Sequence, residues 1–124
     1  MDQKQSSEDY LEAILVLSER LPVVRSVDIA NELGFKKPSI SVAMKKLREK
    51  KLVTVNDSGF IYLTDAGKAI AEEIYERHTL FTKWLTKLGV DSTVAANDAC
   101  KIEHAISKES FEAIKKYIKL KSLF

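Results

Sequence analysis

Three residues in the last quarter of this 124-residue chain carry the side chains of a transition-metal site. Cys100, Glu103 and His104 stand at positions i, i+3 and i+4, so on a helix they project from one face. Thiolate, carboxylate and imidazole are groups that bind first-row divalent metals. Three ligands from one helix face are an incomplete set, so further ligands must come from other parts of the chain.

Two other segments offer such ligands. Asp9 and Glu12, at i and i+3, place two carboxylates on one face of an N-terminal helix, and His78 falls in the middle of a long helical segment. Each candidate also has an ordinary structural explanation: a buried cysteine, a solvated acid–histidine pair, the acidic first turn of a helix, or a surface histidine. Spacing alone therefore does not establish that three helices converge.

The elements that must position these residues are mainly helical. Apolar residues recur every three or four positions, which predicts helices over about 7–20, 26–33, 38–50, 64–88, 92–106 and from 108 onward. Ser6 or Ser7 is expected to cap the first helix and Ser26 the second, and Gly34 is expected as a left-handed C-cap. Asp91 or Ser92 and Ser107 are expected to open the last two helices.

The order of elements predicts a winged helix-turn-helix. The helices over 26–33 and 38–50 are joined by a short glycine-containing turn. Two β-prone runs, 52–55 and 60–63, then flank an Asn-Asp-Ser-Gly cluster, which predicts a hairpin, or wing. We therefore expect a DNA-binding domain over 1–70 and a helical metal-binding and dimerisation domain over 71–124, sharing the long helix that starts near Thr64.

Charge gathers on the second helix of this motif. Residues 36–51 hold seven lysines and arginines against one acid, Glu49, although the whole chain has a net charge of only +2. Such a patch is typical of a nucleic-acid contact, and a solvated helix face would look the same. An apolar Val42 on the outward side suits a thymine methyl in the major groove. The residues expected to contact DNA are Lys36, Lys37, Ser39, Val42, Lys45 and Lys46.

Composition excludes several classes of protein. No apolar run reaches the roughly 20 residues of a membrane span, and the N-terminus lacks the apolar segment of a secretory signal, so a cytoplasmic protein is expected. One cysteine excludes an internal disulfide. A small metallohydrolase would need an HExxH-type pairing or an evident nucleophile, and neither occurs, so we expect no enzyme. The main alternative to a metal sensor is a winged-helix regulator of a small organic ligand.

Several segments resemble the diphtheria toxin repressor/manganese transport regulator family. Residues 97–104 resemble that family's metal-binding helix, and residues 7–14 resemble its first helix. Residues 26–30, 38–41, 63–67 and 77–78 also match in order and spacing. The resemblance extends from Ser6 to Ile118, so it covers nearly the whole chain.

This resemblance implies a metal-dependent repressor that binds an operator in double-stranded DNA as a homodimer and controls metal-ion homeostasis. The metal would sit where the first, fourth and fifth helices meet and would fix the orientation of the reading half. The ligands implied by the resemblance are Asp9, Glu12, His78, Cys100, Glu103 and His104.

The ligand set combines two branches of that family. Asp9 and Glu12 follow the manganese sensors, whereas Cys100 follows the iron sensors. Mn²⁺ or Fe²⁺ is therefore expected, with Zn²⁺ and Co²⁺ as further candidates, because a thiolate favours softer ions. The ancillary-site positions hold Ala96 and Thr82, so one main site is expected and a weaker second site is left open. The C-terminal SH3-like domain of longer members is not expected.

Overall fold

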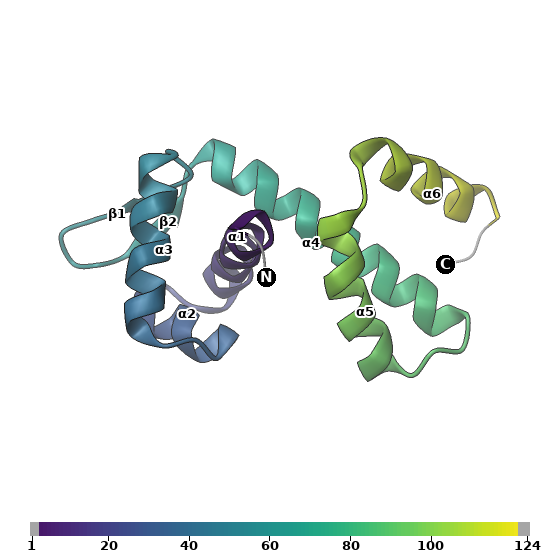
Figure 1. Cartoon of the computed structure of the whole chain (residues 1–124), viewed down its shortest axis with the longest axis horizontal. Coiled ribbons are helices and arrows are strands. Elements are labelled where there is room, and N and C mark those ends of the chain that lie inside the picture. The colour runs from purple at the N-terminus through teal and green to yellow at the C-terminus, as the bar shows by residue number, and fades with distance from the viewer. Residues whose placement is uncertain (1–2, 122–124) are drawn as a thin grey trace. The chain divides into compact units, whose positions relative to one another are not determined.

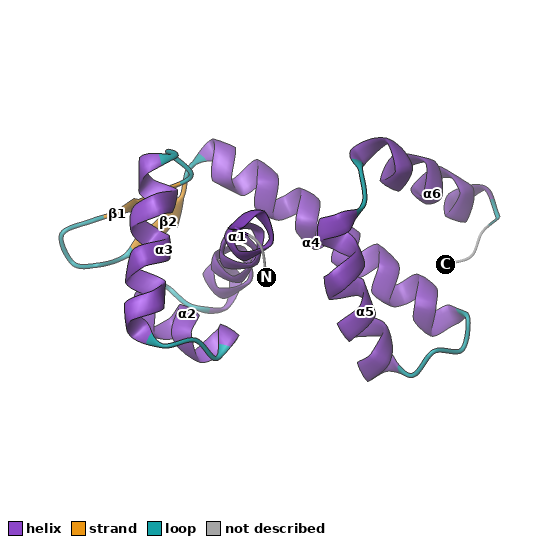
Figure 2. Cartoon of the chain, viewed as in Figure 1, coloured by secondary structure: helices purple, strands orange, loops and turns teal. Residues whose placement is uncertain are grey.

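The computed structural model of the chain describes residues 3–121. Within these residues the chain folds into helices and one two-stranded antiparallel sheet (Figures 1 and 2), which confirms the expected mainly α fold with a winged helix-turn-helix. The elements are α1 (Gln3–Arg20), α2 (Ser26–Leu33), α3 (Lys37–Glu49), β1 (Val53–Val55), β2 (Ile61–Leu63), α4 (Asp65–Lys87), α5 (Ser92–Ala105) and α6 (Lys108–Leu120).

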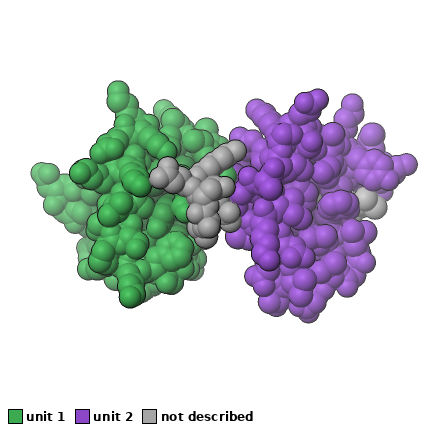
Figure 3. All heavy atoms as spheres, viewed as in Figure 1, with its two compact units in different colours: residues 1–72 green, residues 73–124 purple. Residues whose placement is uncertain are grey.

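The chain divides after Glu72 into two compact units, coloured separately in Figure 3. Helix α4 contributes its first two turns to the first unit and its remainder to the second. Each unit has its own apolar core, so the two are described one at a time.

The first unit buries the apolar faces of α1, α2 and α3 together with the hairpin. Leu11 and Ile14 of α1 meet Ile29 of α2 and Ile40 of α3 in a core where each side chain is at most 1% exposed. Apolar residues on a period of three or four turn one stripe of each helix inward. This packing holds α3 so that its other face is free to point outward.

The wing forms where the turn residues predict it. Val53 pairs with Leu63 and Val55 with Ile61 across the two strands. The side-chain oxygen of Asn56 accepts hydrogen bonds from the backbone N–H groups of Ser58 and Phe60, at 3.0 and 2.9 Å. An asparagine that bonds the backbone two residues on is a turn former, and here it closes the hairpin loop.

Two predicted N-caps are wrong. Helix α1 begins at Gln3, so Ser6 and Ser7 lie inside it, because the glutamines and lysine before them are good helix formers. The N-cap of α2 is Arg25, and Ser26 is the first helical residue. The carboxylate of Asp28, the third helical residue, accepts from the Arg25 backbone N–H at 2.9 Å, so an acid inside the helix rather than a serine cap holds this helix start.

The second unit packs α5 and α6 against the C-terminal part of α4. Phe81 of α4 and Phe111 of α6 meet edge to face, with ring centroids 5.8 Å apart, and Ala99 of α5 is fully buried in the same core. Asp91 caps α5 and Ser107 caps α6, each accepting a bond from a backbone N–H in the first turn, as predicted. These caps fix where α5, the helix of the candidate ligands, begins and where the chain turns after it.

A close backbone approach joins the wing to α4. The Thr64 backbone N–H donates to the Leu52 carbonyl at 3.0 Å, and the Thr64 hydroxyl accepts from the Gly67 N–H at 3.1 Å. A methyl group on Gly67 would overlap the Leu52 carbonyl oxygen. Glycine is therefore required here by space rather than by an unusual backbone angle.

Replacing Gly67 with alanine is expected to lower the free energy of unfolding by roughly 1–3 kcal/mol, as overpacking does. In an unhindered helix the same change would stabilise the protein by up to about 1 kcal/mol, so the sign is diagnostic. Chemical denaturation measures it, with Ala69→Ser at a neighbouring exposed position as the control. A more stable Gly67→Ala variant would contradict the packing described here.

Candidate metal centre and nucleic-acid interface

The C-terminal half of α5 brings three candidate ligands together. Cys100, Glu103 and His104 each offer one ligand atom, and these atoms lie within 4.8 Å of one another. The Glu103 side chain is fully buried, and the imidazole of His104 is only 4% exposed. The helical spacing of the three residues thus produces a cluster of sulfur, oxygen and nitrogen donors around a buried carboxylate.

His78 reaches the same carboxylate from α4. Its Nδ1 atom lies 2.9 Å from Glu103 Oε2, and His104 Nε2 lies 3.3 Å from Glu103 Oε1. With metal–ligand bonds of roughly 2.0–2.2 Å, neighbouring ligand atoms on one ion stand about 3 Å apart. Each distance therefore suits a pair of donors on one cation, and the two histidines face different oxygens of Glu103.

The chemistry of the cluster fits a divalent transition metal. Among residues 3–121, Glu103 Oε1 is a buried oxygen that receives no hydrogen bond. The other oxygen contacts His78, and a bound cation would compensate the cost of burying this carboxylate more fully. The donors are one thiol, one carboxylate and two imidazoles, a set that suits iron, cobalt or zinc.

The two remaining candidates belong to the first unit. Asp9 and Glu12 lie on one face of α1, and both are half-buried. Between them in sequence, Tyr10 sits in the core, where burial, and to a lesser degree the Asp9 carboxylate, raises the pKa of its phenol above the ordinary value of 10.0. Whether Asp9 and Glu12 share an ion with the α5 ligands stays a prediction.

Helix α3 has one buried face and one basic, exposed face. Ile40, Met44 and Leu47 are at most 5% exposed, whereas Val42 on the other side is 57% exposed. All six residues expected to contact DNA are exposed: Lys36, Lys37, Ser39, Val42, Lys45 and Lys46. Their exposure agrees with the predicted contacts with a duplex, which stay a prediction.

A hollow of about 350 Å³ lies beside this surface, within the first unit. Its α3 wall includes Ser39, Val42 and Lys46, and its α1 wall includes Ser6 and Ser7. The sequence did not predict that these two serines line the hollow, because they were expected to cap the helix. An earlier helix start at Gln3 would have placed them on the face that lines the hollow.

Arg77 is a further buried residue that the sequence did not single out as part of a site. Its side chain is 9% exposed, although it is charged. Ile70, Ile74 and Phe81 occupy the same stripe of α4, so the signal was an arginine in an apolar stripe. Charged side chains are almost never buried unless they are paired, and Arg77 is indeed paired.

A winged helix-turn-helix followed by a helical unit with a thiolate–carboxylate–imidazole cluster defines a metal-responsive DNA-binding regulator. Comparison with known families agrees. Residues 3–59 match the N-terminal DNA-binding domain of the iron-dependent repressors, and residues 64–120 match the metal-binding and dimerisation domain of the same family. The chain belongs to the iron-dependent repressor family of transcriptional regulators.

Relatives of known sequence support this assignment. The transcriptional regulator MntR of Escherichia coli O6:H1 is 32% identical over 108 residues, which are 87% of this chain and 70% of that protein. An uncharacterised helix-turn-helix regulator of Methanocaldococcus jannaschii is 34% identical over 113 residues, 90% of each chain. The sequence similarity to both relatives therefore extends over both units.

Solved structures give the same fold. The manganese regulator SloR matches 91% of this chain at 29% identity with a TM-score of 0.81. A manganese-dependent transcriptional repressor in complex with manganese matches 91% at 28% identity with a TM-score of 0.82. This chain spans about half the length of these two structures.

Family membership confirms the expectation of a metal-dependent, DNA-binding repressor with a divalent metal cofactor. It also confirms DNA and a second copy of the chain as partners, and it does not support the organic-ligand alternative. None of the helices described here is long and apolar enough to cross a membrane.

Binding of Co²⁺ or Fe²⁺ is expected to stabilise the protein, because the ion compensates the buried Glu103 carboxylate. At a free metal concentration 100 times the Kd, the gain is about 2.7 kcal/mol. Glu103→Gln, which removes the charge and keeps the shape, is expected to abolish that gain. Thermal unfolding with added metal and with chelator measures both, and the exposed Glu109→Gln on α6 is the control. A Glu103→Gln variant stabilised as much as wild type would rule out this carboxylate as a ligand.

Proposed function

We propose that this protein represses genes of metal-ion homeostasis by binding their operators as a homodimer when a divalent transition metal occupies the cluster around Glu103. The observation that carries the proposal is that Glu103 groups with Cys100 and His104, and separately with His78, within the unit that matches the family's metal-binding domain. The cluster serves binding rather than catalysis, so the protein is not an enzyme. It acts in the cytoplasm, where its DNA lies.

The full ligand set joins both units. Asp9 and Glu12 of α1 would add oxygen donors to the four residues from α4 and α5. Their half-buried position, their shared helix face and the family's resemblance in residues 7–14 support this assignment. The two units correspond to the proposed domains, with a DNA-binding domain over 1–70 and a metal-binding and dimerisation domain over 71–124.

An ion held in this way couples metal to DNA. Helix α1 belongs to the reading unit, whereas Cys100, Glu103 and His104 belong to the dimerisation unit. A shared ion restricts how the two units orient, and in a dimer that sets the spacing of the two α3 helices near one or more DNA turns of about 34 Å. Without the ion, the carboxylates proposed to share it would repel one another. Metal that binds the DNA-competent state preferentially must then tighten DNA binding, by linkage.

The DNA contacts divide into two kinds. Ser39 and Val42 lie on the exposed face of α3, where they would meet base edges in the major groove. Lys36, Lys37, Lys45 and Lys46 would contact phosphates, which set affinity and register without reading sequence. The wing tip carries no lysine or arginine at 56–59, so its contribution to affinity is minor.

The identity of the metal depends on Cys100. The relatives named above include manganese regulators, and hard Mn²⁺ prefers oxygen donors. A thiolate at position 100 shifts the preference toward Fe²⁺, Co²⁺ or Zn²⁺, while Asp9 and Glu12 would keep some affinity for Mn²⁺. We therefore propose Fe²⁺ or Mn²⁺ as the cellular ion, with Cys100 as the residue that discriminates between them.

Metal is expected to tighten operator binding by roughly 5- to 150-fold, the usual size of an allosteric coupling. Fluorescence anisotropy of a labelled promoter fragment, with metal and with chelator, measures this ratio. Glu103→Ala should bring the ratio close to one because the ion no longer binds. An operator affinity that is the same with and without metal in the wild type would contradict the proposal.

Lys46→Ala is the matched variant for the other half of the molecule. The substitution should weaken operator binding by the same factor with and without metal, because Lys46 is expected to contact a phosphate. It should also reduce the slope of log affinity against log salt concentration by about one. The ratio between the two conditions should stay at the wild-type value.

A further inference from the structure

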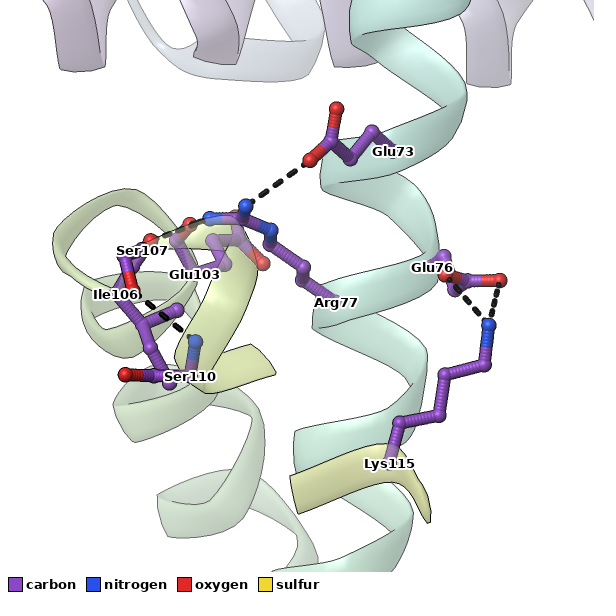
Figure 4. Close-up of polar contacts among 8 residues, drawn as sticks. All are labelled: Glu73, Glu76, Arg77, Glu103, Ile106, Ser107, Ser110 and Lys115. Atoms are coloured by element: carbon purple, nitrogen blue, oxygen red, sulfur yellow. Dashed lines mark hydrogen bonds and ion pairs between the residues drawn. The ribbon is translucent and has the colours of Figure 1, made fainter. Parts of the chain in front are cut away.

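Arg77 makes several contacts within the second unit, as Figure 4 shows. Its Nη1 atom donates to the carbonyl oxygens of Glu103 and Ile106, at 3.0 and 2.7 Å. Its Nη2 atom donates to Glu73 Oε1 at 3.0 Å, and the guanidinium lies over the Phe111 ring, 5.3 Å from its centroid. A buried arginine with partners on α4, α5 and α6 ties these three helices together.

The contacts with α5 are those of a helix C-cap. Helix α5 ends at Ala105, and Ile106 has an extended backbone. The last carbonyl groups of a helix lack donors from within it, and a positive charge is favourable beside the negative end of the helix dipole. The Arg77 guanidinium meets both needs at the end of the helix that carries the candidate ligands.

Glu103 is held at both of its ends by neighbouring residues of α4. Arg77 binds its backbone carbonyl, and the next residue, His78, faces its carboxylate at 2.9 Å. The backbone contact therefore fixes the height of Glu103 along α4. Any slip of α5 past Arg77 would change the distance between the His78 and Glu103 donors.

We infer that Arg77 is a positioning residue of the metal centre, which sets the α5 ligands against His78 without touching the ion. This inference rests on the proposed function, since it requires that the cluster binds a metal. Residues outside the ligand set that orient metal ligands commonly change metal affinity 10- to 100-fold when they are replaced.

A second ion pair in the same unit provides the comparison. Lys115 of α6 lies 3.2 Å from both carboxylate oxygens of Glu76 on α4, and it is drawn beside Arg77 in Figure 4. This ion pair joins α4 and α6, and neither of its two bonds involves α5. Glu76 is also half exposed. Its loss should therefore leave the cluster unchanged.

The test titrates the full chain with Co²⁺ and follows the absorption band of the cobalt–thiolate bond at 25 °C. Arg77→Met keeps an unbranched stem against Phe111 and removes the donors, and it is expected to weaken Co²⁺ binding about 10- to 100-fold. Arg77→Lys keeps the positive charge and should recover part of the affinity. Lys115→Met should bind within about threefold of wild type. Circular dichroism without metal verifies that each variant is folded.

Each outcome decides between a positioning and a purely structural role. If folded Arg77→Met melts at a lower temperature but binds Co²⁺ with wild-type affinity and an unchanged band, the inference is wrong. If Arg77→Met does not fold, Arg77→Lys decides, and wild-type affinity in that variant overturns the inference. A wild-type chain that gives no cobalt–thiolate band would instead overturn the ligand role of Cys100 in the proposed function.

Discussion

The proposed metal chemistry of the second unit depends on one buried carboxylate. Glu103 is fully buried beside two imidazoles and a thiol, and one of its oxygens receives no hydrogen bond within residues 3–121. An ionised group in such a place needs an opposite charge or a set of donors. Arg77, the nearby buried cation, donates to the backbone of Glu103 and to Glu73 instead. The imidazoles of His78 and His104 face its two oxygens, and a metal ion shared with them would balance the buried charge. Metal binding would then stabilise the folded unit.

The proposed mechanism follows from where the ligands lie along the chain. The winged helix needs only its own core to present α3, as the packing of Ile29, Ile40 and Leu47 shows. A DNA-binding unit of this kind has no inherent reason to respond to metal. In the proposed mechanism the response would arise because the ion also takes Asp9 and Glu12 from α1 and so restrains the unit that reads DNA.

Much of the fold could be predicted from the sequence because it depends on local rules. Helical periodicity located every helix, Asn56 and Gly59 marked the hairpin turn, and the caps at Asp91 and Ser107 were correctly placed. The grouping of Cys100, Glu103 and His104 also followed from spacing on one helix. Errors occurred where several polar residues competed to start a helix, as at Ser6, Ser7 and Ser26, since a serine caps only if the backbone turns at that residue.

The role of Arg77 could not be predicted in the same way. Its partners at Glu103 and Ile106 lie 26 and 29 residues later in the chain, so its contacts depend on tertiary packing. By residue type alone it is a solvated helix residue, and only its place in the Ile70–Ile74–Phe81 stripe hinted at burial. The hollow lined by Ser6 and Ser7 likewise depends on where α1 begins relative to α3 within the first unit.

X-ray absorption of the Co²⁺-loaded protein at the metal edge tests the central claim most directly, since it counts the donor atoms around the ion. The account predicts one sulfur atom at about 2.3 Å, with nitrogen and oxygen atoms at roughly 2.0–2.2 Å, and loss of the sulfur in Cys100→Ser. A shell of oxygen atoms alone, as in a hydrated ion, would contradict it.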